Sequence, residues 1–335
     1  MIRFALVAAS TLGFVLTAAL GNLMVPLLRE LENTRARQTR KEKKEEKQPE
    51  AQPAPTLGGL CLMVGTLTAA GMGWMAACIA QPELLGSDRL LMSRLLLTLF
   101  GALAFGAVGL AEDLVRLRTG SPLGLRRGVR LSLEAAAAAA ELLLLNAKGC
   151  LSTGVQLADR YVELGAAAPL LWGLVLVALA ESARAADGAD GTVCGASFVT
   201  MLGLMVLETQ LGWFPLAVLP AALAGALMAF LLWNFPPAKM HPGRCGSLFL
   251  AGMIGYGPLC MGYAELSVPL ALPFWAEGGM VLLQILHFRC TGRPLFRAAP
   301  LHRWLEKRGV SAVNIFYTIC VLSVCGLLLA MRLVR

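Results

Sequence analysis

Long apolar runs separated by short clusters of charge constrain this chain more than any other feature of its sequence. A helix of about 20 apolar residues crosses the hydrocarbon core of a bilayer, and most of these runs approach or exceed that length. Charged residues make up 15% of the chain, whereas soluble domains carry about 25%. The mean hydropathy of +0.68 points the same way. The sequence therefore predicts an all-α, polytopic membrane protein.

The positions of the apolar runs predict about ten transmembrane helices. The first run does not resemble a cleavable signal peptide, because it lacks a strongly basic start and an obvious small-residue cleavage site followed by a soluble chain. The predicted spans are 4–28, 57–80, 90–111, 131–147, 166–182, 195–207, 212–234, 246–264, 267–287 and 313–333.

Basic residues are distributed unequally between the two sets of loops. The loops after spans 1, 3, 5, 7 and 9 contain 22 of the 29 Lys and Arg residues. Positive residues favour the cytoplasmic side, so we expect these five loops to be cytoplasmic and both termini to be extracytoplasmic. Topology, with some attraction to anionic lipid headgroups, accounts for the net charge of +8. The composition predicts no nucleic-acid partner.

We expect one transmembrane domain over residues 1–335, with a polar cytoplasmic insert at 29–55. The composition of the insert favours a solvated linker over an arm that binds lipid or a partner. The nine cysteines include no CxxC pair, and most lie in spans, where Cys behaves as a small apolar residue. We therefore expect neither disulfides nor a cysteine metal site.

Five predicted cytoplasmic loops contain nearly all of the informative polar residues. The segment Pro55-Thr56-Leu57-Gly58-Gly59 enters span 2, and the adjacent carboxylates Glu112 and Asp113 close span 3. Carboxylates at a membrane boundary are costly to desolvate and are functional by default. They are candidates for Mg²⁺ binding, because Mg²⁺ favours carboxylate and phosphate oxygens; a solvated helix end is the alternative.

The remaining loops add an acidic turn and two basic segments. The turn Asp187-Gly188-Ala189-Asp190-Gly191 suits a nucleotide or metal pocket, or is an ordinary turn. Residues 233–247 contain prolines that end a helix, and Gly246-Ser247 opens the next one. His302 lies among basic residues of the last loop, where contact with phosphate is chemically reasonable.

Taken in order, these loops resemble those of the polyprenyl-phosphate N-acetylhexosamine-1-phosphate transferases, and most closely the phospho-N-acetylmuramoyl-pentapeptide transferases. The likeness extends over almost the whole chain. The segment 55–59 is similar to the family's Pro-Thr-Met-Gly-Gly, 109–113 to Gly-Phe-x-Asp-Asp, and 187–191 to Asp-Gly-Leu-Asp-Gly. Asn234 with Pro237-Ala238 matches an Asn-x-x-Pro-Ala signature, and 292–302 follows the family's last loop.

The resemblance implies a role for each matching position. Glu112, Asp113 and His302 would be catalytic, and Asp113 and Asp187 would be the metal ligands. Asp187, Gly188, Asp190 and Asn234 would bind the nucleotide. The basic side chains of Arg116, Arg244 and Arg303 are candidates for binding phosphate on their own chemistry. The implied cofactor is Mg²⁺, and the implied partners are membrane lipid, polyprenyl phosphate and a UDP-sugar, with a homodimer or another cell-wall synthesis protein as further alternatives.

Three departures from the family pattern affect the positions expected to carry the chemistry. Arg244 stands where the family has its main magnesium-binding Asp, Arg184 replaces an Asn, and Arg303-Trp304 replaces the last two residues of a triple His. A cation in place of a metal-binding carboxylate reverses the sign of the local interaction. We expect Arg244 to pair with the neighbouring carboxylates and to suppress Mg²⁺ binding.

Three functions remain open on the sequence. The favoured hypothesis is a member of the family at the cell membrane, its site facing the cytoplasm, that binds lipid phosphate, nucleotide or a partner but has impaired or lost catalysis. An active Mg²⁺-dependent phosphoglycosyl transferase, transferring a phospho-sugar from a UDP-sugar to polyprenyl phosphate in cell-envelope glycan synthesis, is the first alternative. A transporter that reuses the fold is the second.

Overall fold

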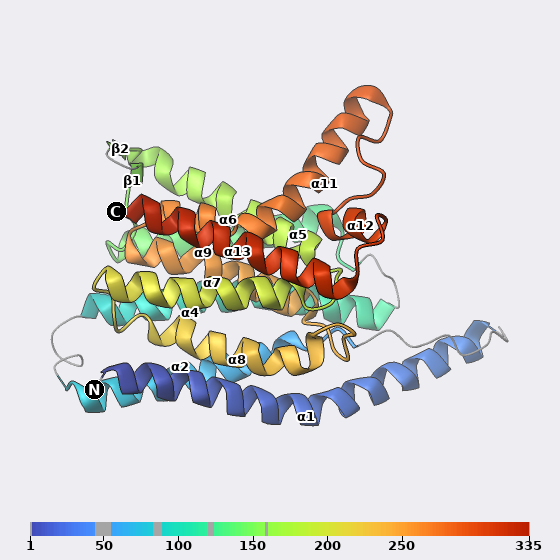
Figure 1. Ribbon diagram of the computed structural model, residues 1–335, viewed down its shortest axis with the longest axis horizontal. Helices are drawn as coiled ribbons and strands as arrows, with labels where there is room; N and C mark the ends of the chain where they lie inside the picture. Colours follow the sequence, from blue (N-terminus) through green and yellow to red (C-terminus); the bar gives the residue numbers. More distant parts are fainter. Residues whose placement is uncertain (1, 44–54, 83–88, 120–123, 158–159, 335) are drawn as a thin grey trace.

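The computed structural model describes residues 2–43, 55–82, 89–119, 124–157 and 160–334, and not the side chains of 2–3, 31–43, 89 and 157. Most of the described chain is helical (Figure 1). The long helices are α1 (Ile2–Lys43), α2 (Gly59–Ala80), α4 (Arg89–Thr119), α5 (Arg127–Ala147), α6 (Ala168–Ala186), α7 (Thr192–Gln210), α8 (Val218–Asn234), α9 (Gly243–Met261), α11 (Leu272–Thr291) and α13 (Ala312–Val334).

Each predicted span coincides with one of these ten helices, with shifts at the ends. Among the described residues, six helices are long and apolar enough to cross a membrane, and a bent pair would be a seventh. The protein is therefore a polytopic, α-helical membrane protein. The prediction for the seventh span was wrong at its start: α8 begins at Val218 rather than 212, because Gly212 has a φ of +81° and Pro215 follows in the connecting turn.

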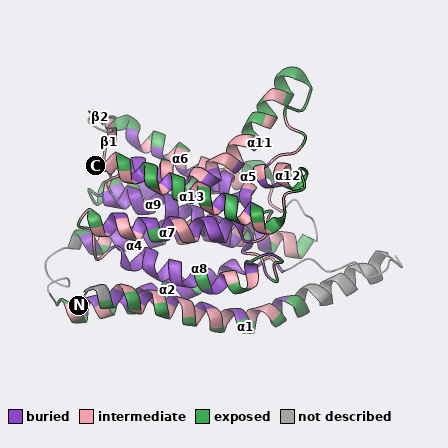
Figure 2. Cartoon of the chain, viewed as in Figure 1, coloured by how far each residue is buried: buried purple, intermediate pink, exposed green. Residues whose placement is uncertain are grey.

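Helix α9 lies at the centre of the bundle, and it is the element that positions the site. Of its residues, all except Arg244 are buried, and Figure 2 shows burial concentrated in α7, α8 and α9 while α1 and α13 present exposed faces. A Cβ on Gly252 would lie 2.6 Å from the Cα of Ala102. Small residues thus let α4 and α9 pack at close range.

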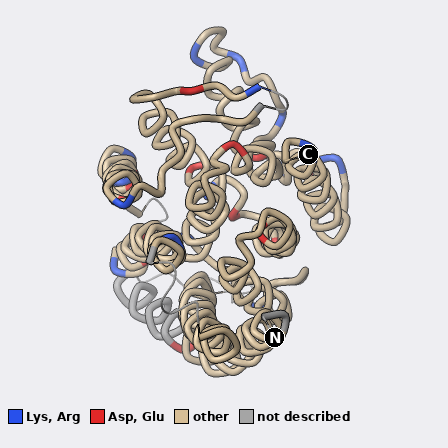
Figure 3. Tube along the Cα trace, turned by 90° about the vertical axis from the view of Figure 1, so that its left-hand side faces the viewer, with Lys and Arg blue, Asp and Glu red and all other residues tan. Residues whose placement is uncertain are grey.

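The two ends of the bundle differ in what they contain. Helix α1 begins and α13 ends at the same end, and α12 (Leu301–Glu306) lies at the other end together with the α8–α9 loop (Figure 1). Figure 3 looks along the bundle from the end with the termini, and most of the trace carries no charge. The candidate site residues therefore gather at the end opposite the termini.

Two features were not predicted. Strands β1 (Gly154–Leu157) and β2 (Arg160–Glu163) form an antiparallel hairpin between α5 and α6. The short helices η1 (Gly165–Ala167), η2 (Ala264–Leu266) and α10 (Ser267–Leu270) precede longer ones, and the chain bends by 73° between α10 and α11. Helix α11 consequently leans away from the bundle (Figure 1).

The first part of the predicted insert at 29–55 continues α1, which extends to Lys43, and residues 44–54 lie outside the described residues.

Candidate functional site

The segment before α2 docks on the segment before α9 through backbone hydrogen bonds. The His241 N–H donates to the Pro55 carbonyl at 2.8 Å, and the Gly58 and Gly59 N–H groups donate to the carbonyls of His241 and Pro242 at 3.0 and 2.8 Å. A Cβ on Gly59 would lie 2.2 Å from the Gly246 nitrogen. The two glycines therefore allow the close approach of α2 and α9, which is a structural role.

Asp113 holds the start of α9 in place. Its Oδ2 accepts a hydrogen bond from the Cys245 N–H at 2.9 Å, in the first turn of α9. The first N–H groups of a helix lack intrahelical partners and favour a negative charge. Asp113 thus acts as a cap supplied by another helix. Its Oδ1 is buried and has no hydrogen-bond partner among the described residues.

Arg184, at the end of α6, is the centre of a buried ion-pair cluster. Its guanidinium pairs with Glu112 of α4 and Glu134 of α5, and its Nε lies 3.2 Å from Glu181 Oε1. Arg130 of α5 pairs with both oxygens of Glu181, at 3.1 and 3.0 Å. The exposed side-chain fractions of Arg184, Glu112 and Glu134 are 8%, 2% and 0%. The cluster joins three helices at one end of the bundle.

Arg244 projects from the first turn of α9 toward the end of α6. Its Nη1 donates to the Arg184 carbonyl at 2.6 Å and lies 3.6 Å from Asp187 Oδ2. Burial raises the pKa of the Asp187 carboxyl, an effect that the positive charge of Arg244 opposes. Burial likewise lowers the pKa of the Arg244 guanidinium, and Asp187 opposes that shift. Each charge of this pair therefore stabilises the other.

A polar cavity of about 360 Å³ collects several of the predicted residues. His302 of α12 lines it and is buried, with Nδ1 3.1 Å from Glu277 Oε2 of α11. Its Nε2 would be 2.8 Å from a Cβ on Gly188, so this position accommodates glycine but no larger residue without rearrangement. The cavity is lined by Glu181, Arg184, Ala185, Asp187, Gly188, Arg244, Val281, Ala299, Pro300, His302 and Arg303.

Asp190 and Asn234 are not among the residues that line this cavity. Asp190 accepts from the Ala238 N–H at 2.8 Å, and Asn234 donates to the Met240 carbonyl at 2.9 Å. Both side chains thus fix the α8–α9 loop. Arg116 follows Glu112 by one turn of α4, and its positive charge reaches Asp187 and Arg244.

The carboxylates expected to bind metal are already engaged. Glu112 pairs with Arg184, Asp113 accepts from a backbone N–H, and Asp187 faces Arg244. Mg²⁺ requires oxygen ligands in near-octahedral geometry, and in the described part of the chain no three His, Cys, Asp or Glu side chains are grouped so that they could hold a metal ion. In this arrangement the residues do not fit a magnesium ion.

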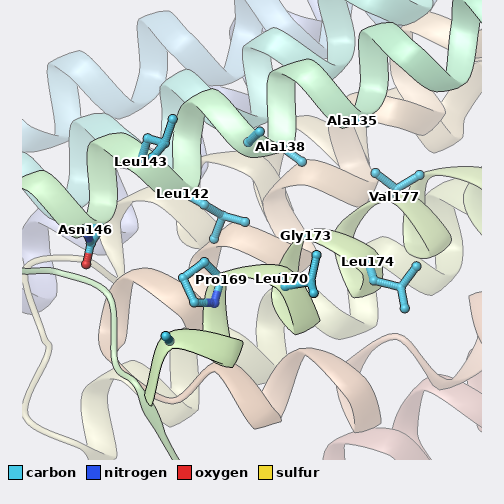
Figure 4. Close-up of a pocket in the computed structure, with 12 residues that line it drawn as sticks. Ala135, Ala138, Leu142, Leu143, Asn146, Pro169, Leu170, Gly173, Leu174 and Val177 are labelled. Carbon is cyan, nitrogen blue, oxygen red and sulfur yellow. The ribbon is translucent and has the colours of Figure 1, made fainter. Parts of the chain in front are cut away.

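Other hollows among the described residues are predominantly apolar, and two of them border α6. One of about 620 Å³ lies between α5 and α6, and its lining is mostly Ala, Leu, Gly, Pro and Val, with Asn146 at one end (Figure 4). The other, of about 290 Å³, lies between α5, α6 and α11. The second shares Glu181, Ala185 and Val281 with the polar cavity, so an apolar groove adjoins the charged site.

Sequence reasoning missed four charged residues of this site: Arg130, Glu134, Glu181 and Glu277. Glu134 and Glu277 lie inside predicted spans, where ionisable residues are rare and usually functional, and that signal could have singled them out. Glu181 also lies in a predicted span, one turn before Arg184, and Arg130 directly precedes span 4. Apart from Arg184, which pairs with Glu181 within α6, their partners lie on other helices, which the sequence alone does not pair.

Comparison with known proteins agrees with this architecture. The profile of glycosyl transferase family 4 matches residues 95–261. The chain is 33% identical to the phospho-N-acetylmuramoyl-pentapeptide-transferase of Moorella thermoacetica, over 76% of each chain. It is 32% identical to that of Symbiobacterium thermophilum, over 88% of this chain and 85% of the relative.

A further relative is similar over nearly its full length. The phospho-N-acetylmuramoyl-pentapeptide-transferase of Geobacillus kaustophilus is 29% identical over 98% of this chain and 96% of its own. The motif resemblance, the helical bundle and these relatives agree. The chain belongs to the phospho-N-acetylmuramoyl-pentapeptide-transferase family, within glycosyl transferase family 4.

Proposed function

We propose that this protein binds the phosphate groups of polyprenyl phosphate and of a UDP-sugar at the cavity lined by Arg244 and Arg303, without carrying out Mg²⁺-dependent transfer. The observation that carries the proposal is the position of Arg244. Its Nη1 lies 3.6 Å from Asp187 Oδ2, and by the motif resemblance it stands where the family has its metal-binding Asp. A guanidinium binds phosphate directly through its planar array of donors, and so keeps affinity for the anion while excluding the metal.

The surroundings of the cavity support binding of a lipid phosphate. The groove between α5, α6 and α11 offers Trp275, Val281 and Leu282 to an apolar chain and ends beside the polar cavity. Arg303 is exposed at that cavity. A phosphate at the end of a polyprenyl chain would thus meet a basic side chain where the apolar groove ends.

The second candidate is an active transferase, which the retained Asp113, Asp187 and His302 favour. Catalysis would require Mg²⁺ to neutralise the charge that develops on the departing nucleotide. Transfer to undecaprenyl phosphate from UDP-N-acetylmuramoyl-pentapeptide, by purified protein with and without Mg²⁺, separates the two. We expect binding of the lipid phosphate in the absence of Mg²⁺ and no lipid-linked product in either condition. Product formed only with Mg²⁺ would establish the transferase instead.

We also propose one transmembrane domain of ten spans, with both termini extracytoplasmic and the cavity at the cytoplasmic face of the cell membrane. A partner at this face, either a second copy or a cell-wall synthesis protein, is compatible with this arrangement. The support is the excess of basic residues in the predicted cytoplasmic loops and the location of both chain ends opposite the cavity (Figure 1).

Cysteine labelling tests this orientation. In a background that lacks the two exposed cysteines, Cys290→Ser with Cys325→Ser, we expect Tyr161→Cys, on the exposed strand β2, to react with an impermeant maleimide in intact cells. Arg297→Cys, on the exposed loop after α11, should react only after permeabilisation. The reverse labelling pattern would place the cavity on the outer face.

A further inference from the structure

The most unusual feature of the site is an arginine buried among three carboxylates. Arg184 contacts Glu112, Glu134 and Glu181, which come from α4, α5 and α6. Glu134 is fully buried, and its second oxygen, Oε2, has no hydrogen-bond partner among the described residues. A buried carboxylate without a cation is costly, so this cluster requires a positive charge at its centre.

The charges of the cluster show what kind of occupant it accepts. Glu112, Glu134 and Glu181 supply three negative charges, and Arg130 already takes both oxygens of Glu181. Glu112 and Glu134 pair with the two terminal nitrogens of one guanidinium, Nη1 and Nη2 of Arg184. Two converging carboxylates also suit a divalent cation. The carboxylate pair thus forms a cation site, and the cation in it is a side chain of the same protein, Arg184.

Two of the three arginines that depart from the family pattern, Arg184 and Arg244, are in direct contact. The Arg244 Nη1 donates to the Arg184 carbonyl at 2.6 Å, so the end of α6 is bound to the start of α9. Arg244 faces Asp187, while the Arg184 side chain points to Glu112 and Glu134. The two guanidinium groups therefore neutralise separate sets of carboxylates.

We infer that Glu112 and Glu134 form a latent divalent-cation site in which the Arg184 guanidinium is the resident cation. The inference deepens the proposed function, because it names a residue that makes a metal dispensable for assembling the site. Removal of Arg184 leaves two converging buried carboxylates, whose repulsion a divalent ion relieves. The site then becomes dependent on metal for its stability.

Thermal unfolding of the full-length protein in detergent tests the inference, with Mg²⁺ or Mn²⁺ as the probe. For the wild-type protein we expect the same Tm in EDTA and in about 10 mM of either ion, a concentration that would saturate even a weak site. Arg184→Asn should have a lower Tm in EDTA and recover several degrees with the ion. Adding Glu112→Gln and Glu134→Gln to Arg184→Asn should abolish the response to metal.

Arg303→Asn is the matched control, because Arg303 lines the same cavity but is exposed. Its Tm should not respond to metal. Should Arg184→Asn not fold in chelator, the yield of folded protein purified with Mn²⁺ is the second measurement, and restoration of that yield supports the inference. An Arg184→Asn protein that does not respond to metal in either measurement would overturn it, as would a wild-type Tm that rises with metal. If the wild-type protein carried out Mg²⁺-dependent transfer while its Tm did not change with metal, only the proposed function would be overturned.

Discussion

Replacing Arg244 by Asp is expected to create a magnesium site where the wild-type protein binds Mg²⁺ weakly or not at all. Arg244 lies 3.6 Å from Asp187 Oδ2 and beside Asp113, whose carboxylate reaches the same turn of α9. At 4 Å and an effective dielectric of 20, a carboxylate attracts Mg²⁺ by about 8 kcal/mol before desolvation, and a guanidinium repels it equally. Desolvation removes most of this difference. We expect about 100-fold tighter binding, which corresponds to about 3 kcal/mol.

Calorimetric titration with Mg²⁺ measures this gain, and Arg303→Asp is its control. Arg303 lies on the same cavity but is exposed, so its replacement by Asp changes the charge equally in a screened position. Arg303→Asp should change Mg²⁺ affinity by less than about tenfold. Tight binding to the wild-type protein that the Arg244→Asp substitution leaves unchanged would show that Arg244 does not occupy the metal position. Catalysis need not return with the metal, because Arg303 and Trp304 also depart from the family pattern.

The helices could be predicted because each is a local pattern. Hydropathy placed a span at every long helix, including α7, whose predicted core of 195–207 lies inside Thr192–Gln210. The hairpin at 154–163 could not be predicted in this way. Its strands are four residues long, and β2 is exposed along its length, so neither an apolar run nor an alternating pattern marks it.

The candidate site was predictable in its location and less so in its contacts. Asp187, Arg244 and His302, which come from three different loops of the sequence, line one cavity. Asp113 binds a backbone N–H in the first turn of α9, and Asn234 binds a carbonyl of the segment before α9, instead of lining the cavity. Which acceptor or donor a side chain finds depends on helix packing, which no local pattern specifies.

The role of Arg184 illustrates the same limit. From the sequence it is a departure from a family motif with no assigned partner. Its partner Glu134 is 50 residues away in a predicted span, and the ion pair becomes visible only when α5 and α6 are packed together. A change of charge at one position of a family motif therefore reveals the role of that position only when the residue that faces it is also known.

Gly243→Ala is expected to disrupt the site as a whole, because this glycine lies where three segments meet. A Cβ at this position would lie 1.8 Å from the Thr56 carbonyl oxygen and 2.9 Å from Asp113 Oδ2. It would thus push apart the segment before α2, the end of α4 and the start of α9. The φ of +67° adds a cost of about 1 kcal/mol for any residue with a Cβ. Together with overpacking of about 1–3 kcal/mol, the loss of stability is about 2–4 kcal/mol.

Thermal unfolding in detergent measures this loss, and Gly71→Ala in α2 is the matched control. A Cβ on Gly71 would meet no atom within 4 Å, and Ala is the better helix former by about 1 kcal/mol, so that variant should unfold at or slightly above the wild-type temperature. If both alanine variants unfolded at the wild-type temperature, the segment 55–59 would not be held against the start of α9 as described, and the cavity would have a different shape. A selective loss in Gly243→Ala, together with loss of phosphate binding, would tie the ligand site to this three-way junction.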